Sequence, residues 1–302
     1  MKHITLLPGW ALALQTMQPL RAALLERLPD TSVDILPLPA IQLSSLETDL
    51  SSLAQQIKPG VLVGWSLGGM LAVQLHRRFP EHFPQVATLA SNACFVERRD
   101  WVQAMPTEMF KSFYQDYREA PEKTLKRFAL LVAQGSPQAR HLARTLAWDG
   151  LDAEQRLHAL AVLGMLDNRV ALSRPLQPML HCFAGQDALV PVAAAEAIDA
   201  LHDASQVVVY EQASHALPLE QPLWLAEQIA AWLEAQHALG QIQADNRPLT
   251  PGSQCPAEVA GATAQVDDVP RCEAIRQTRQ QVAADTALQR GGLVVGGRGA
   301  AE

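Results

Sequence analysis

The sequence predicts an α/β fold in which a mostly parallel, doubly wound sheet carries an inserted helical lid. Short apolar runs bounded by Pro, Gly or polar residues alternate with longer stretches of helical period, which is typical of parallel strands joined by helices. One long interval lacks such runs and interrupts the alternation. A Gly-Trp-Ser-Leu-Gly-Gly motif lies where an apolar run gives way to a helical stretch, and it favours an enzyme built on this sheet.

Six apolar runs are the predicted buried strands. They are residues 3–7, 33–38, 60–63, 86–90, 179–184 and 206–210. Helical periodicity predicts helices over 70–79, 193–201 and 222–239. Reactive groups in parallel sheets lie at the carboxyl ends of the strands, so we expect the functional residues just after the strand ends.

The interval from 97 to 168 contains no strand-like run. Its aromatic residues recur at helical spacing, as in Phe110, Phe113, Tyr114 and Tyr117. We therefore expect a helical lid inserted between two strands of the core sheet. An insertion at the carboxyl end of a strand would lie over the catalytic face.

The end of the chain differs in composition from the rest. All 16 aromatic residues precede position 233, and 8 of the 17 glycines lie after position 239. Because this end lacks the apolar residues of a core, the sequence predicts one catalytic domain over 1–240 and a largely disordered extension over 241–302.

Charge and cysteine content narrow the function classes. The 24 basic and 31 acidic residues give a net charge of −7, so we expect neither a nucleic-acid nor a membrane partner. No stretch of 18 uninterrupted apolar residues is present, which predicts no membrane span. Cys94, Cys182, Cys255 and Cys272 show no metal-ligand or disulfide spacing, which favours the cytoplasm and predicts no metal site. We expect a monomer that needs no cofactor.

Ser66 is the candidate nucleophile, at the centre of the motif over 64–69. The glycines around it permit a sharp strand-to-helix turn, which would expose the hydroxyl above the sheet and leave the N–H of Leu67 free. A glycine-rich turn with an incidental serine is the alternative. The strand before the motif and the helix after it argue against that alternative.

A nucleophilic serine needs a base, and the base needs an orienting acid. On a strand-turn-helix motif of this kind, the expected chain order is Ser, then Asp or Glu, then His. Asp187 follows the fifth predicted strand and His215 follows the sixth. We assign His215 as the base and Asp187 as the acid, with a turn-forming Asp as the alternative for Asp187.

The oxyanion hole needs two N–H donors. Leu67 supplies one by its place in the motif. Trp10, in the loop after the first strand, is the candidate for the second. The alternative for Trp10 is a hydrophobic plug, and the two roles are compatible.

Several of these segments are shared with a known family. They are Gly9-Trp10, the 64–69 motif, Ala90-Ser91 with Cys94-Phe95, Arg127-Phe128-Ala129-Leu130, Gly185 with Asp187 and Leu189-Val190-Pro191, and Ser214-His215-Ala216. Over about residues 3–236, the sequence resembles the α/β-hydrolase superfamily and, within it, the pimeloyl-[acyl-carrier protein] methyl ester esterases of biotin synthesis. It departs from the family at Pro8, where a histidine usually precedes the Gly-Trp pair.

The resemblance implies a serine carboxylesterase that hydrolyses the methyl ester of pimeloyl-[acyl-carrier protein] through an acyl-serine on Ser66 and releases methanol. It implies substrate contacts at Trp10, Ser66, Leu67, Phe128, Ala129, Leu130, Leu131, Val132 and His215. From the residues alone, Phe128, Leu131 and Val132 line an acyl tunnel, pack the lid on the body, or do both.

Residues 122–150 carry a local net charge of +3. Lys123 and Arg127 are four apart, as are Arg140 and Arg144, so each pair can share a helix face. These four positions align with carrier-contacting positions of the family, so the resemblance implies docking of an acidic acyl-carrier protein. An ordinary solvated helix face is the alternative.

Two other functions stay open. One is a general short-chain carboxylesterase or a related acyltransferase. The other is a catalytically silent hydrolase-fold binding module, against which the complete Ser66, Asp187 and His215 order argues.

Overall fold

The computed structural model describes residues 2–175, 177–202 and 204–245. The chain divides into two units, 1–247 and 248–302. The predicted C-terminal extension lies outside the described residues from position 246 onward. Within the described part, no helix is long and apolar enough to cross a membrane.

A single six-stranded sheet forms the centre of the fold, and all its strands are parallel. The strand order is β2-β1-β3-β4-β5-β6. The strands are β1 (Lys2–Leu7), β2 (Thr31–Ile35), β3 (Val61–Trp65), β4 (Gln85–Leu89), β5 (Leu180–Ala184) and β6 (Gln206–Tyr210). The predicted parallel α/β sheet is confirmed. The chain order reverses direction at β1 and β3, and such a reversal places a crevice at the carboxyl ends of the strands.

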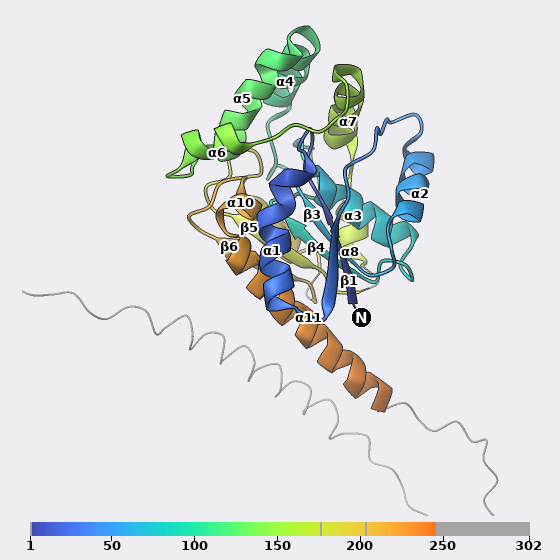
Figure 1. The fold of residues 1–302 in the computed structure, drawn as a ribbon. Helices are drawn as coiled ribbons and strands as arrows, with labels where there is room; N and C mark the ends of the chain where they lie inside the picture. Colours follow the sequence, from blue (N-terminus) through green and yellow to red (C-terminus); the bar gives the residue numbers. More distant parts are fainter. Residues whose placement is uncertain (1, 176, 203, 246–302) are drawn as a thin grey trace, which may run out of the picture. The chain divides into compact units, whose positions relative to one another are not determined.

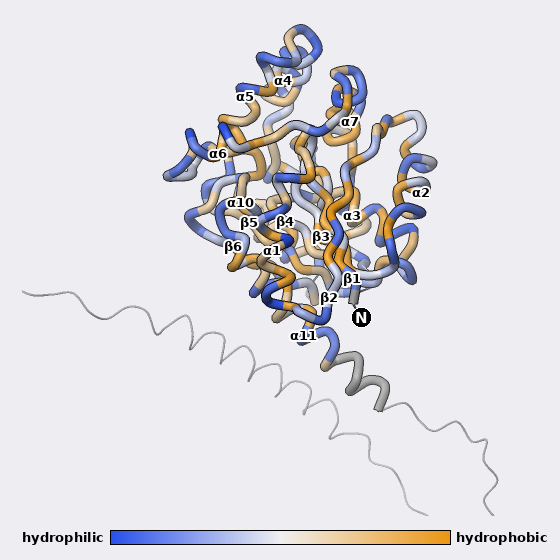
Figure 2. Tube along the Cα trace, viewed as in Figure 1, coloured by the Kyte–Doolittle hydropathy of each residue, from blue (hydrophilic) through white to orange (hydrophobic). Residues whose placement is uncertain are grey.

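Helices cover both faces of this sheet (Figure 1). Outside the interval between β4 and β5 they are η1 (Leu14–Met17), α1 (Gln18–Arg27), α2 (Leu46–Gln56), α3 (Leu67–Arg78), α9 (Ala193–Asp199), α10 (Leu217–Glu220) and α11 (Pro222–Asp245). Helices α1 and α11 pack together, and α3 packs against β3, β4 and α2. Apolar residues concentrate along the strands, as Figure 2 shows, because both sheet faces are buried.

The interval between β4 and β5 forms a helical insert. Its helices are α4 (Thr107–Glu119), α5 (Pro121–Ala133), α6 (Ala139–Thr145) and α7 (Ala153–Met165), and the short α8 (Arg169–Ser173) leads from its end toward β5. Pro121 opens α5 at a position that needs no N–H, and a capping box between Asp152 and Gln155 starts α7. In Figure 1, α4 to α7 lie beyond one end of the strands.

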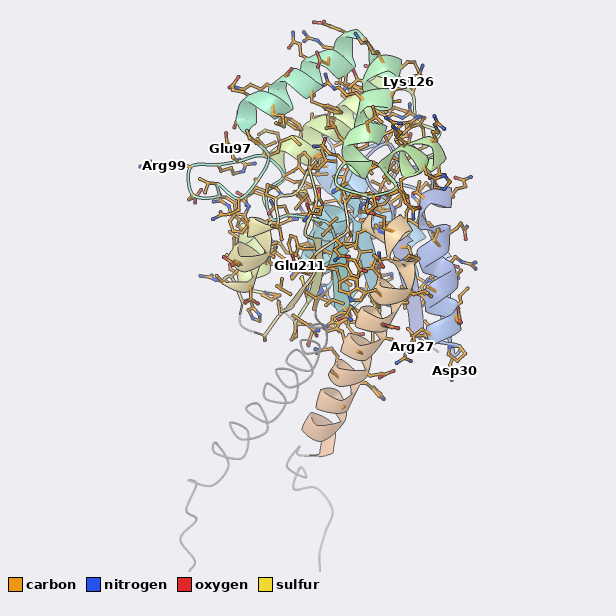
Figure 3. The ribbon with its side chains drawn as sticks, turned by 90° about the vertical axis from the view of Figure 1, so that its left-hand side faces the viewer. Arg27, Asp30, Glu97, Arg99, Lys126 and Glu211 are labelled. Atoms are coloured by element: carbon orange, nitrogen blue, oxygen red, sulfur yellow. The ribbon has the colours of Figure 1, made fainter. Side chains whose placement is uncertain are left out.

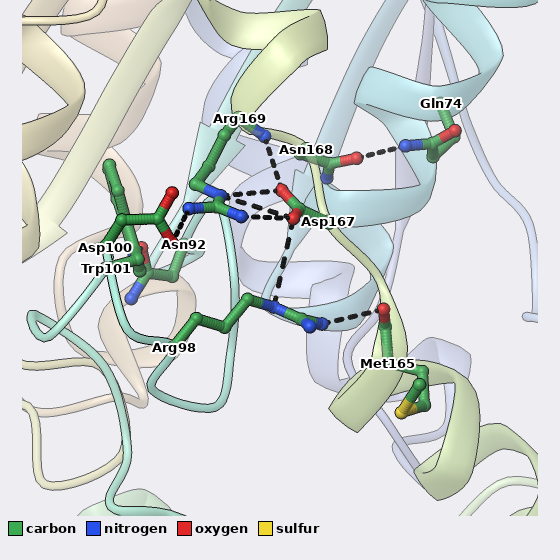
Figure 4. Close-up of polar contacts among 9 residues, drawn as sticks. All are labelled: Gln74, Asn92, Arg98, Asp100, Trp101, Met165, Asp167, Asn168 and Arg169. Atoms are coloured by element: carbon green, nitrogen blue, oxygen red, sulfur yellow. Dashed lines mark hydrogen bonds and ion pairs between the residues drawn. The ribbon is translucent and has the colours of Figure 1, made fainter.

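The two ends of the insert meet beside α3, and Figure 4 shows the amide of Asn168 facing Gln74 of that helix. Asn168 is fully buried, and its backbone N–H donates to the carbonyl of Ala93 at 2.8 Å. Its side-chain amide donates to the carbonyl of Met70 on α3 at 3.0 Å and accepts a hydrogen bond from Gln74. The start and the end of the insert are therefore fixed to each other and to α3.

Ion pairs surround this junction. Arg169 binds Asp167 with a contact of 2.7 Å, and this hydrogen bonding lowers the pKa of Asp167 to about 2. Arg98 donates to the carbonyl of Met165 at the end of α7, at 2.9 Å. The junction thus combines buried amide contacts with charged contacts nearer the solvent.

Candidate active site

Ser66 lies on the sharp turn between β3 and α3. Its backbone has φ 55° and ψ −118°, a strained conformation for a non-glycine residue, and the residue is buried. Only glycine fits at two neighbouring positions. A Cβ at Gly64 would lie 2.3 Å from the carbonyl oxygen of Gly68, and one at Gly68 would lie 2.4 Å from that of Leu7. The close packing of this turn explains the glycines of the motif.

Asp187 and His215 form a hydrogen-bonded pair at the ends of β5 and β6. The Nδ1 atom of His215 lies 2.7 Å from Oδ2 of Asp187, and both side chains are 1% exposed. The other carboxylate oxygen of Asp187 accepts the N–H groups of Leu189 and Val190, at 2.8 and 2.9 Å. The carboxylate is therefore held in place on both oxygens. The structure brings together this pair as the sequence predicts.

The loop that carries His215 is fixed from two sides. The indole N–H of Trp65, next to Ser66, donates to the carbonyl of His215 at 2.9 Å. The backbone N–H and hydroxyl of Ser214 both donate to the carboxylate of Glu220, at 2.7 and 2.5 Å. Trp65 thus connects the loop of the histidine to the strand of the candidate nucleophile.

The two candidate oxyanion donors lie next to Ser66 in the structure. Leu67 begins α3, where backbone N–H groups have no partner within the helix. A Cβ at Gly9 would lie 3.4 Å from Cβ of Ser66, so the loop that leads into Trp10 runs beside the serine. Within residues 2–175, 177–202 and 204–245, the N–H groups of Leu67 and Trp10 donate to no other protein group.

The indole of Trp10 packs against the insert. Its ring meets those of Phe113, Tyr117 and Phe128 edge to face, at centroid distances of 5.7, 5.1 and 5.0 Å. Its Nε1–H donates to the carbonyl of Arg156 on α7 at 2.7 Å. The side chain of Trp10 is thus shared between the body and the insert.

An apolar cavity of about 450 Å³ lies between the body and the insert. Its wall is formed by Trp10, Phe95, Met105, Met109, Phe110, Ser112, Phe113, Arg127, Phe128, Leu131, Leu160, Leu163, Ala188 and Leu189. Ala188 and Leu189 directly follow Asp187, so one wall adjoins the Asp–His pair. Phe110 and Phe113 show a helical spacing in the sequence, but their role in the wall depends on how α4 packs.

The segment 128–132 divides between different environments because it spans more than one helical turn. Phe128 and Leu131 line the cavity. Ala129 and Val132 are buried on α5, whereas Leu130 is 56% exposed. The carbonyl of Val132 accepts the N–H of Ala216, next to the histidine, at 3.1 Å.

The four predicted docking residues are exposed on α5 and α6. Arg127 forms an ion pair with Asp116 at 2.8 Å, and its guanidinium lies 5.6 Å from the centroid of the Phe113 ring. Arg127 also lines the cavity, so it connects the basic surface with the cavity mouth. Figure 3 shows Lys126 of α5 at the outer side of the insert, far from Arg27 and Asp30 of the body.

The two cysteines of the described residues are buried inside the fold. Cys94 and Cys182 are buried free thiols, and burial raises the pKa of Cys94 to about 11. A thiol with such a pKa stays protonated and is a poor nucleophile. Cys255 and Cys272 lie outside the described residues. The described part of the chain contains no group of three or more His, Cys, Asp or Glu residues that could hold a metal ion.

Comparisons with known proteins agree with this fold. The model of the alpha/beta hydrolase family matches residues 6–228. The chain is 38% identical to the biotin biosynthesis bifunctional protein BioHC of Cellvibrio japonicus, covering 76% of this chain and 47% of that protein. It is 31% identical to the pimeloyl-[acyl-carrier protein] methyl ester esterase of Klebsiella pneumoniae, covering 76% of this chain and 92% of the esterase. The chain thus spans about half the length of the bifunctional relative and nearly all of the esterase.

Solved structures share the fold at low sequence identity. A bromoperoxidase from Bacillus anthracis superimposes with a TM-score of 0.66 at 16% identity, covering 77% of this chain and 92% of that one. An esterase from Exiguobacterium antarcticum superimposes with a TM-score of 0.64, also at 16% identity, covering 78% and 92%. At such identities the likeness concerns the fold.

Proposed function

The chain belongs to the alpha/beta hydrolase family and, within it, to the family of the pimeloyl-[acyl-carrier protein] methyl ester esterases, and from this premise we propose that it hydrolyses the methyl ester of pimeloyl-[acyl-carrier protein]. The reaction releases methanol and leaves a free carboxylate on the carrier-bound chain. The observation that carries this proposal is the serine on a strained strand-to-helix turn, whose neighbour Trp65 hydrogen-bonds the loop of a buried Asp–His pair, with an apolar cavity walled in part by Trp10 and Leu189.

In the first half of the reaction, Ser66 attacks the ester carbonyl. His215 takes the proton of the hydroxyl at Nε2, because the contact with Asp187 keeps the other ring nitrogen protonated. The tetrahedral intermediate places a negative charge on the former carbonyl oxygen. The N–H groups of Leu67 and Trp10 donate hydrogen bonds to that oxygen.

In the second half, His215 passes the proton to the leaving methoxide, and methanol departs. The acyl chain stays bound to Ser66 as an ester. A water molecule then gives its proton to His215 and attacks the acyl carbonyl, and the collapse of the second tetrahedral intermediate returns the proton to Ser66. The products are methanol and the carboxylate.

The apolar cavity suits a neutral ester on a methylene chain. Its volume falls within the range of roughly 300–1,000 Å³ that small-molecule sites occupy. Burial of a methyl ester costs little, whereas burial of the carboxylate product removes hydration from a charge. The same lining therefore favours binding of the substrate and release of the product.

The basic surface of α5 and α6 supports an acidic protein as the carrier of the substrate. Lys123, Arg127, Arg140 and Arg144 are exposed there, and Arg127 reaches the cavity wall. A carrier bound at this surface would present its acyl chain to the cavity. We place the reaction in the cytoplasm, where acyl-carrier proteins work, with the enzyme acting as a monomer.

The proposal is tested with the purified full chain and pimeloyl-[acyl-carrier protein] methyl ester, following the release of methanol. We expect turnover by the native protein and a loss of several orders of magnitude in kcat for Ser66→Ala, since the nucleophile is removed. Ser173→Ala on α8 is the matched control, and it should retain native turnover.

Two other results would point elsewhere. Hydrolysis of short nitrophenyl esters without hydrolysis of the carrier-bound ester would identify a general carboxylesterase. A native protein that neither hydrolyses esters nor reacts at Ser66 with a fluorophosphonate would be a binding module, and the proposed activity would be wrong.

A further inference from the structure

The insert holds the oxyanion loop, residues 9–13, through a short segment that we call the strap, residues 147–149. Leu12 and Trp148 pair as an antiparallel β-bridge. Two backbone hydrogen bonds of 2.9 Å flank this bridge, from the N–H of Ala13 to the carbonyl of Ala147 and from the N–H of Asp149 to the carbonyl of Ala11. The backbone of the insert therefore holds in place the loop that runs past Ser66.

A buried ion pair fixes the strap in turn. The guanidinium of Arg156 on α7 donates to the carboxylate of Asp149 at 2.7 Å and to its backbone carbonyl at 2.6 Å. The two side chains are only 11% and 9% exposed. The same carboxylate oxygen accepts the N–H of Leu151 at 3.2 Å. Buried charges persist in proteins when they are paired and hydrogen-bonded in this way.

The backbone of Arg156 completes the connection. Its carbonyl accepts the indole N–H of Trp10 at 2.7 Å. Each partner of the ion pair therefore holds the oxyanion loop through its own backbone. The N–H of Asp149 donates to the carbonyl of Ala11, and the carbonyl of Arg156 accepts the indole N–H of Trp10.

The conformation of the loop makes such support necessary. Ala11 has φ 59°, in the left-handed region that non-glycine residues seldom occupy, and it is buried. A non-glycine residue in this region is strained, and it persists where the surroundings hold it. Here the strap binds its carbonyl directly, so the path of the chain at Trp10 depends on the insert.

We infer that Asp149 and Arg156 are positioning residues for the oxyanion hole. Their ion pair holds the strap against the oxyanion loop and so keeps the N–H of Trp10 aimed, with that of Leu67, at the developing oxyanion. The inference rests on the proposed hydrolase function, and it assigns the insert a part in transition-state stabilisation as well as in forming the cavity.

The kinetic consequence follows from where the pair acts. The charged groups of Asp149 and Arg156 do not line the cavity, so they make no direct contact with a bound acyl chain. An oxyanion donor stabilises only the tetrahedral state, and its geometry matters within a few tenths of an ångström. Loss of the pair should therefore lower kcat and leave KM nearly unchanged.

The test compares Arg156→Gln and Asp149→Asn with the native full chain on a short nitrophenyl ester, with rates divided by the active sites titrated with a fluorophosphonate. We expect kcat to fall about 10- to 100-fold, with KM within about twofold of the native value. Affinity for a trifluoromethyl ketone, which forms a tetrahedral adduct on Ser66, should fall by the same factor as kcat/KM.

The matched control is Arg78→Gln, which removes the ion pair with Glu47 at the far end of α3. It should leave both kcat and ketone affinity unchanged, whatever it does to stability. If Arg156→Gln does not fold, Asp149→Asn decides alone, because the amide keeps the shape of the side chain and an acceptor for Leu151.

The possible outcomes separate the two proposals. Native protein that hydrolyses no ester would refute the proposed function. Active native protein with unchanged kcat per titrated site in the variants would overturn the role of the ion pair, as would a rise in KM with kcat preserved.

Discussion

The carboxylate of Glu220 accepts two hydrogen bonds from one residue, Ser214, directly before His215. Ser214 is fully buried, so its backbone N–H has no access to solvent. The hydroxyl of Ser214 also accepts the N–H of Ala216 on the other side of His215, at 3.2 Å. One carboxylate thus fixes the backbone on both sides of the imidazole.

Replacing Glu220 should therefore lower catalysis in a graded manner. Glu220→Gln keeps a side-chain oxygen as acceptor but loses the negative charge that strengthens the hydrogen bonds. Glu220→Ala loses the acceptor as well as the charge. We expect kcat to fall about threefold for Gln and about 30-fold for Ala, since an unsatisfied buried N–H costs about 1–3 kcal/mol and displaces the loop. Steady-state kinetics on a nitrophenyl ester, per titrated active site, measures this.

Glu211→Gln provides the control, because this residue is exposed at the end of β6 (Figure 3). It should match the native protein. Equal kcat for Glu220→Ala and the native protein would show that the histidine loop holds its shape without the carboxylate.

The residues that we propose to carry the chemistry have a signal in the sequence, whereas those that we propose to position them have none. Ser66, Asp187 and His215 follow strand ends in a fixed order, which a linear sequence displays. Glu220 and Arg156 carry no such signal, because each acts through a backbone group of a residue that only the folded chain brings near.

At the scale of elements, α5 and α6 carry the four predicted docking residues, all of them exposed. Arg140 and Arg144 are exposed on α6, and no ion pair to either is seen in the described part of the chain. The pair on α5 differs from the pair on α6, because Arg127 also forms an ion pair with Asp116 and lines the cavity. The α6 pair therefore gives the cleaner test of carrier docking.

Reversal of both charges on α6, Arg140→Glu with Arg144→Glu, should raise KM for the carrier-bound ester at least about tenfold, since attraction to the acidic carrier becomes repulsion. The kinetics on a short nitrophenyl ester should stay unchanged. The loss should shrink with rising salt, because exposed charges are screened.

A second double variant, Lys111→Glu with Arg118→Glu on α4, carries the same change of charge on a neighbouring helix. It should affect the carrier-bound ester less than the α6 variant does. Equal effects of the two double variants would contradict docking at α6 and indicate a response to net charge alone.

The strands could be predicted more closely than the insert helices. Buried parallel strands appear as short apolar runs between turn residues, and each of the six runs overlaps an observed strand. Within 97–168, helical spacing continues through the turns, so the sequence indicates helices without their bounds. Leu130 shows the limit, because the same helical segment contains wall residues and an exposed leucine.

At the scale of the whole molecule, a buried histidine in the sheet makes folding sensitive to pH. His181 on β5 is fully buried, and its Nδ1 lies 2.7 Å from the hydroxyl of Thr88 on β4. Burial lowers the pKa of His181 to about 4. In the unfolded chain the same group titrates near its ordinary value of about 6.5.

The free energy of unfolding should therefore fall as the pH is lowered from about 6.5 to about 4. In this range the unfolded chain binds a proton at His181 that the folded chain excludes, and the slope reaches about 1.4 kcal/mol per pH unit. Above about pH 6.5 the group has no effect on the pH dependence. Urea denaturation of the full chain between pH 5 and 7 measures this change in the free energy of unfolding.

His181→Asn is the comparison, because the amide can still bond to Thr88 and does not titrate. This variant should be less stable at pH 7 but lose less stability between pH 7 and 5 than the native protein. Parallel pH profiles of the two proteins would show that other groups control the acid sensitivity.

The two ends of the insert lie side by side, where the N–H of Asn168 donates to the carbonyl of Ala93. A segment whose two ends are joined in this way can change in length or sequence without moving the strands on either side. The insert can therefore be replaced as one unit during evolution, and a protein engineer can replace it by joining a new segment to the chain at this junction. The strap limits such exchange, since any replacement must again supply a partner for the oxyanion loop.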